Sequence, residues 1–169
     1  MSSFDRRKVL AMVASVGSMS VLAGCFRPML AEDSPATALR GRIDLPPVSN
    51  RLSYHLYQSL ESRLGTPGQS DWVLRVTMRK SERDIAIAQD DTATRVSVRL
   101  NADWAVFRKG ETEPVASASA FSESGFNSTR SLFANREARL DVERRLAEDL
   151  GDRIGRAILA RANMILATA

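Results

Sequence analysis

Residues 94–106, TRVSVRLNADWAV, decide the fold, because apolar and polar side chains alternate along them without a break. One set of alternate positions consists of Thr94, Val96, Val98, Leu100, Ala102, Trp104 and Val106. Successive side chains of a β-strand point to opposite faces of the sheet, so this pattern predicts a long strand with one buried face. Such a strand needs neighbours on both sides and a layer to cover its apolar face.

Two further strands are expected beside it. Residues 72–79 alternate in the same way, and a change of apolar parity further on predicts a bulge near residues 81–84. Gln89-Asp90-Asp91 and Lys109-Gly110 are predicted turns, and the Ala- and Ser-rich residues 114–122 are a third strand, followed by a loop over residues 124–131. Short turns between consecutive strands predict an antiparallel meander.

Two amphipathic helices are expected to provide the cover. Leucine recurs every fourth residue from Leu52 to Leu64, with Ser49 or Asn50 as the N-cap and Gly65 at the C-terminus. Residues 132–163 predict a long second helix whose apolar stripe is Ala138, Val142, Leu146, Leu150, Ile154, Ala157 and Ile158. In that helix Ala147, Gly151 and Gly155 form a strip of small residues, which favours close approach to either a strand or the other helix.

A short edge strand completes the predicted order. Residues 42–48 alternate briefly and contain Pro46-Pro47, and proline cannot donate to a strand ladder. The order is therefore β-α-β-β-β-α. We predict an α+β fold, a two-layer sandwich with two helices packed on one face of a four-stranded sheet.

The N-terminal residues have the features of an export signal. Arg6, Arg7 and Lys8 precede an uncharged stretch, residues 9–22, which is shorter than the roughly 20 residues of a membrane-spanning helix. The closing run Leu22-Ala23-Gly24-Cys25 resembles the lipobox of bacterial lipoproteins. The resemblance implies cleavage before Cys25 and a lipid attached to its thiol. We favour this over an ordinary signal peptide with an incidental cysteine and over a buried cytosolic cysteine. We also favour general secretion over twin-arginine export.

Removal of residues 1–24 leaves enough chain for one domain. Residues 25–40 contain prolines and acidic residues with little to bury, which predicts a flexible lipidated tether. The domain is expected over residues 41–165. The leader holds three of the 24 basic and one of the 20 acidic residues, so the mature chain is only mildly basic and any role of positive charge depends on its placement.

Motifs of catalysis and metal binding are missing from the sequence. His55 is the only histidine and Cys25 the only cysteine, which excludes an ordinary zinc cage. No nucleophile elbow or phosphate-binding glycine loop occurs, and Asp90-Asp91 fits a turn better than a calcium loop. We predict that the protein is not an enzyme, binds no metal, and has no cofactor beyond the covalent lipid on Cys25.

Four arginines lie opposite the apolar positions of the first two long strands: Arg75, Arg79, Arg95 and Arg99. If these strands pair, the arginines share the sheet face that the helices leave free. A row of charges is most often a solvated face. The alternative is a surface for phosphates or for the acidic wall of a partner, because guanidinium binds such groups with two parallel hydrogen bonds.

Several segments resemble the LptE family of lipopolysaccharide-assembly lipoproteins. The similar segments are residues 24–30 (GCFRPML), 38–64, 85–95 (IAIAQDDTATR) and 131–134 (SLFA) at the start of the long helix. The resemblance implies a lipid-anchored protein of the outer membrane that faces the periplasm. It also implies a role in the assembly and plugging of the LptD β-barrel and in the insertion of lipopolysaccharide into the outer leaflet.

The resemblance further implies that basic residues bind lipopolysaccharide, although it assigns none of the four arginines to that role. Nucleic acid is not an expected partner. Two other functions stay open from the sequence: an auxiliary lipoprotein of a lipid-transport ABC system, and a periplasmic hydrolase or binding lipoprotein, for which no site is visible.

Overall fold

The computed structural model describes residues 30–87 and 93–168. Its elements are α2 (Pro35–Leu39), β1 (Ile43–Asp44), α3 (Arg51–Leu64), β2 (Trp72–Ile87), β3 (Ala93–Arg108), β4 (Pro114–Asn127), α4 (Leu132–Ala160) and α5 (Ala162–Leu166). The predicted order β-α-β-β-β-α is therefore present, with one short helix added at each end. The lipobox and the predicted turn at residues 89–91 lie outside the described residues.

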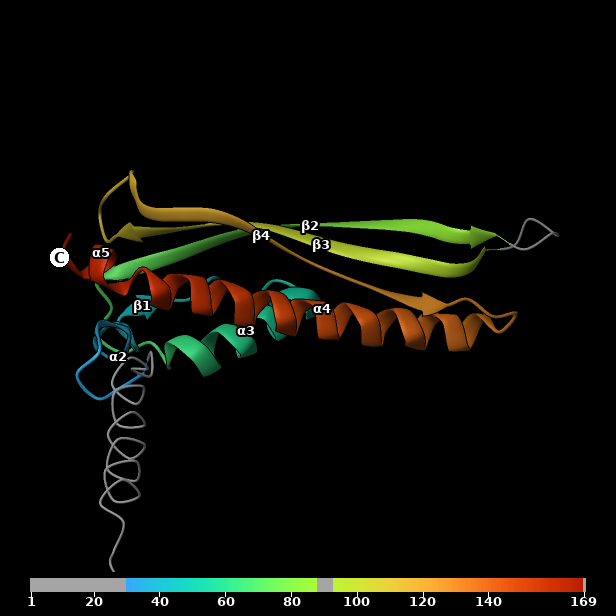
Figure 1. The fold of residues 1–169 in the computed structure, drawn as a ribbon, viewed down its shortest axis with the longest axis horizontal. Helices are drawn as coiled ribbons and strands as arrows, with labels where there is room; N and C mark the ends of the chain where they lie inside the picture. The colour runs from blue at the N-terminus through green and yellow to red at the C-terminus, as the bar shows by residue number, and fades with distance from the viewer. Residues whose placement is uncertain (1–29, 88–92, 169) are drawn as a thin grey trace, which may run out of the picture.

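The strands form one sheet in the order β1-β2-β3-β4. β1 pairs parallel with β2, whereas β2–β3 and β3–β4 are antiparallel, as the meander prediction required. Figure 1 shows α3 and α4 on the same side of this sheet. The predicted α+β two-layer architecture is confirmed.

The core lies between the sheet and the two long helices. Even-numbered positions of β3 face it, and Val98, Leu100 and Val106 are fully buried. The helices contribute Leu56, Leu60 and Leu64 from α3 and Val142, Leu146, Leu150, Ile154 and Ile158 from α4. Each fully buried aliphatic side chain stabilises the fold by about 1.5–3 kcal/mol relative to exposure.

Both predicted ends of α3 are confirmed. The Asn50 side chain accepts a hydrogen bond from the Ser53 N–H, and the Ser53 hydroxyl accepts one from the Asn50 N–H, both at 2.9 Å. These reciprocal bonds form a capping box that satisfies otherwise unpaired donors of the first turn. Gly65 follows the last turn with φ of 83°, a conformation that favours glycine.

The strip of small residues on α4 faces α3 rather than a strand. A Cβ on Gly151 would lie 2.8 Å from the Ser59 Cβ, and one on Gly155 would lie 2.8 Å from the Arg63 Cβ. This closeness lets the Ser59 hydroxyl donate to the main-chain oxygen of Glu148 at 2.7 Å. The two helices thus pack with almost no side chain between them at this point.

The expectation of a flexible tether is wrong for residues 34–39. Ser34 caps α2 by accepting a hydrogen bond from the Thr37 N–H at 3.1 Å, and Pro35 occupies the first turn, where its missing N–H costs nothing. Ala36 and Leu39 are buried in the core, and Figure 1 shows α2 and α5 at the same end of the molecule. The folded domain therefore begins before residue 41.

Three predicted boundaries also differ. β4 continues to Asn127, through residues expected to be a loop; Gly125 allows this, because a Cβ there would lie 2.8 Å from the Val96 oxygen. α4 ends at Ala160, with Arg161 separating it from α5. The irregularity in β2 lies between Asp84 and Ile87, later than expected.

None of the helices within residues 30–87 and 93–168 combines the length and the apolar character that crossing a membrane requires.

Candidate functional site

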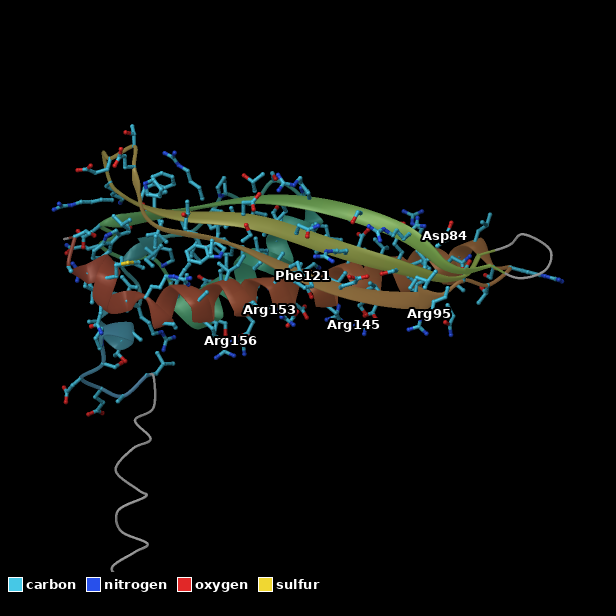
Figure 2. All side chains as sticks on the ribbon, turned by 45° about the horizontal axis from the view of Figure 1, so that its top comes forward. Asp84, Arg95, Phe121, Arg145, Arg153 and Arg156 are labelled. Carbon is cyan, nitrogen blue, oxygen red and sulfur yellow. The ribbon has the colours of Figure 1, made fainter. Side chains whose placement is uncertain are left out.

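The helix-free side of the sheet carries a set of charged and aromatic side chains, here called the arginine face. It comprises Arg75, Arg79 and Arg83 of β2, Arg95, Arg99, Asp103 and Phe107 of β3, and Phe121 and Glu123 of β4. All occupy positions that alternate with the buried ones. The side of the sheet away from the helices comes forward in Figure 2, where Phe121 and Arg95 are labelled.

Two arginines of this face stack on aromatic rings. The Arg75 Cζ lies 4.4 Å from the centre of the Phe107 ring, and the Arg99 Cζ lies 4.0 Å from the centre of the Phe121 ring. Such cation–π contacts stabilise exposed sites by about 0.5–1 kcal/mol each. Stacking uses the flat side of the guanidinium and leaves the N–H groups at its edge for other acceptors. In Arg99 these groups donate to the Asn101 Oδ1 at 3.1 Å and to Glu123 at 3.4 Å.

Two carboxylates offset part of the positive charge. Arg79 pairs with Asp103 at 2.5 Å, and Arg99 pairs with Glu123 at 3.4 Å. A hydrogen bond from Ser119, and after it one from Arg79, hold the pKa of Asp103 below its ordinary value. Asp103 is therefore anionic at neutral pH. Exposed pairs of this kind contribute little stability, and their main effect is to fix the directions of the arginine side chains.

The arginine face is hollowed around Arg75 and Phe107. An open depression of about 430 Å³ is lined by Arg75, Thr77, Asp103 and Phe107, together with small residues of β4. Its lining combines a guanidinium, a carboxylate and an aromatic ring. This lining offers hydrogen-bond donors and acceptors beside an aromatic surface.

The four arginines expected to share one face do so in the structure. Sequence reasoning missed Arg83, because the bulge expected at residues 81–84 left its side undefined. It also missed Phe121, because alternating Ala and Ser in β4 show little contrast between the two faces. In the structure Ser122 is buried, and its neighbour Phe121 therefore points to the opposite, exposed side.

The other residues singled out from the sequence are separate from this face. Leu22, Ala23, Gly24 and Cys25 lie outside the described residues. The His55 side chain is largely buried, with its Nδ1 3.8 Å from Glu148 of α4, which fits the predicted structural role. Within the residues that the structure describes, no cluster of three or more His, Cys, Asp or Glu side chains is arranged to hold a metal.

Comparison with known families places the chain. The sequence matches the profile described as "LptE: Lipopolysaccharide-assembly" over residues 40–158, well over half of the chain. The chain belongs to the LptE family. The LptE match covers the whole arginine face, α3 and nearly all of α4, and it confirms the resemblance seen in the sequence. No match was found among curated proteins.

Solved lipoprotein structures share the fold. A lipoprotein from Caulobacter crescentus CB15 aligns with a TM-score of 0.59 at 17% identity, covering 76% of this chain and 96% of that one. The rare lipoprotein B from Shewanella oneidensis gives 0.54 at 15% identity, with 74% and 96% covered. The minor lipoprotein from Acinetobacter baumannii gives 0.54 at 18% identity, with 70% and 89% covered. At these identities the likeness shows a shared fold and nothing more.

Proposed function

We propose that this protein is a non-catalytic lipoprotein of the outer membrane that supports the assembly of an LptD-type β-barrel, plugs it, and assists the insertion of lipopolysaccharide into the outer leaflet. The observation that carries the proposal is the LptE-family match over residues 40–158. The protein would face the periplasm and be held by lipid on Cys25, with no other cofactor and no nucleic-acid partner.

The arginine face supports a contact with lipopolysaccharide or with the barrel wall. Lipid A bears phosphates, and the interior of a membrane β-barrel is polar. Five arginines against two carboxylates leave this side of the sheet positive, and Arg75 stacks on Phe107 with no carboxylate within ion-pair distance among the described residues. Phosphate is a natural acceptor for arginine, because it accepts two parallel hydrogen bonds from one guanidinium.

Co-purification tests the partner. The full-length protein carries a C-terminal tag, its lipobox is left intact, and membranes are extracted with a mild detergent. The expected result is recovery of a large β-barrel at a fixed ratio to the lipoprotein. Recovery of an ABC permease instead would favour the transport alternative, and recovery of no barrel would refute the proposed partner.

Charge reversal tests the arginine face. Arg95→Glu combined with Arg99→Glu should weaken binding of purified lipopolysaccharide by about tenfold or more. The variant loses two guanidinium groups that would bind phosphate and gains two carboxylates that would repel it. The matched control is Arg145→Glu combined with Arg156→Glu, the same change of charge on α4 (Figure 2). Circular dichroism checks that both variants fold. Equal binding by the two variants would show that the arginine face is merely solvated.

A further inference from the structure

The sheet has an open edge beside an apolar groove. β1 pairs only through Ile43 and Asp44, opposite Trp72 and Val73 of β2. Leu45-Pro46-Pro47 then leads the chain away toward α3, and proline ends the ladder because it has no N–H to donate. From residue 74 onward, no strand among the described residues lies on this side of β2.

The main chain of β2 directs unpaired groups to that edge. The Asp71 oxygen accepts a hydrogen bond from the Lys109 N–H on the β3 side, whereas the Trp72 N–H points to the Arg42 oxygen on the β1 side. Successive residues of a strand direct their N–H and C=O groups to opposite sides. The N–H and C=O groups of Val76 and Met78 therefore face the open edge.

A groove of about 700 Å³ runs along this edge. Its apolar lining comes from Leu45 and Pro46 after β1, Leu52 in the first turn of α3, and Val76 and Met78 of β2. The side chains of Leu45, Leu52, Val76 and Met78 are only partly buried although they pack on the core. The groove thus presents apolar surface and unpaired main-chain groups side by side.

Charge limits what the groove can accept. Its lining includes the cation Lys80 and no carboxylate. Residue 75 also borders the groove, but its guanidinium lies over Phe107 of β3, on the arginine face. Lys80 is neutralised by Glu143 at 2.6 Å and Glu82 at 3.2 Å. These three side chains form a polar cluster at the Lys80 end of the groove. Arg75 has no carboxylate within ion-pair distance among the described residues. An acidic group on the helix-free face of this edge, next to Arg75, would complement its charge.

We propose that the edge of β2 from Leu74 to Met78 accepts an extended segment of a partner protein as an added strand. The segment places an apolar side chain in the groove and, at a neighbouring position, an acidic side chain on the helix-free face beside Arg75. Its main chain pairs with that of Val76 and Met78. The proposal relies on the proposed function only for the first partner to test, the barrel.

Two other occupants fit the groove less well. An acyl chain would fill the apolar lining but would leave the N–H and C=O groups of Val76 and Met78 without partners, which is costly away from water. A second copy paired antiparallel about Thr77 would set Arg75 of each chain opposite Arg79 of the other, and like charges directly opposite destabilise a strand pair.

Val76→Pro tests the edge directly. Proline removes the outward N–H of residue 76 but no hydrogen bond to β3, so the sheet itself should persist. Val76→Ala is the matched control, because it shortens the side chain and keeps the N–H. In the co-purification described above, the proline variant should recover at least about tenfold less barrel, because an unpaired buried group costs that much in binding, whereas the alanine variant stays within about threefold.

Amide exchange of the wild-type protein provides a measurement that needs no substitution. In the detergent-extracted complex, peptides covering residues 74–78 should exchange at least about tenfold more slowly than in the isolated lipoprotein. Unchanged exchange together with normal recovery by Val76→Pro would refute the added strand. Equal slowing by vesicles of lipopolysaccharide alone would assign the groove to an acyl chain, and slowing that accompanies dimer formation in sedimentation would assign it to a second copy.

A photoreactive residue at Leu52 in living cells separates this proposal from the proposed function. If no barrel is recovered, a crosslink to an acid-bearing segment of another envelope protein, lost in Val76→Pro, would still support the added strand. If no such crosslink forms, the added strand is refuted as well.

Discussion

Single side chains on the helix side of the sheet join the two layers through polar contacts as well as apolar ones. The hydroxyl of Ser122, buried in β4, donates to the Asp149 carboxylate at 2.6 Å, and Arg153 donates to the same oxygen at 2.7 Å. Burial raises the pKa of Asp149, but the hydrogen bonds from Ser122 and Arg153 outweigh it and hold the pKa below its ordinary value. The folded state therefore favours the charged form.

Asp149→Asn should lower the free energy of unfolding at pH 7 by about 1 kcal/mol, a figure kept small because the carboxylate is partly exposed. A carboxyl whose pKa is lower in the folded state stabilises the fold above its unfolded-state pKa. That stabilisation is lost as the pH falls through the folded-state pKa. Denaturant unfolding at pH 7 and pH 3 should show the difference between wild type and variant shrinking at low pH. A difference that is constant with pH would contradict this account.

Some residues were identifiable from sequence and others were not, for physical reasons. The four arginines of β2 and β3 were predictable because their strands alternate large apolar with charged side chains. Phe121 was not, because the Ala and Ser residues around it fit either face. The acidic partners Asp103 and Glu123 depend on strand register, which a single sequence does not specify.

The two short helices, α2 and α5, are held by their packing on the core. Five-residue helices are not stable alone, so α2 and α5 depend on packing. The sequence contains the N-terminal signals of α2, Ser34 and Pro35. The helix was still not predicted, because the segment is polar overall and only Ala36 and Leu39 are buried in it. Long elements such as α3 and α4 were predictable because their apolar stripes repeat over several turns.

Leu39→Ala should destabilise the protein by about 2–5 kcal/mol, because the Leu39 side chain is fully buried and its removal leaves a cavity. Ala38→Ser is the control: residue 38 is exposed on the same helix, and its change should stay within about 0.5 kcal/mol. Thermal or denaturant unfolding of both variants measures the effect. Equal stability of the two would mean that residues 35–39 belong to the tether after all.

The proposed membrane anchoring of the whole molecule depends on Cys25. Cys25→Ala removes the only thiol, so lipid cannot be attached and the peptidase that acts after lipidation has no substrate. The expected result is a precursor that retains residues 1–24, detected by intact mass. Ser15→Ala in the leader is the matched control and should be processed normally. A Cys25→Ala protein of mature mass would show that an ordinary signal peptidase cuts the chain.

The lengths of β2, β3 and α4 determine how long the molecule is. Sixteen-residue strands extend over about 50 Å at the usual rise, and the 29-residue helix α4 over about 43 Å. A bilayer with its headgroups is about 40–45 Å thick. α2 lies at one end of this rod and the start of α4 at the other (Figure 1). The proposed lipid on Cys25, which precedes α2 in the sequence, would therefore tether the α2 end. Aligned with the axis of a membrane pore, the rod would bring its far end level with the opposite surface.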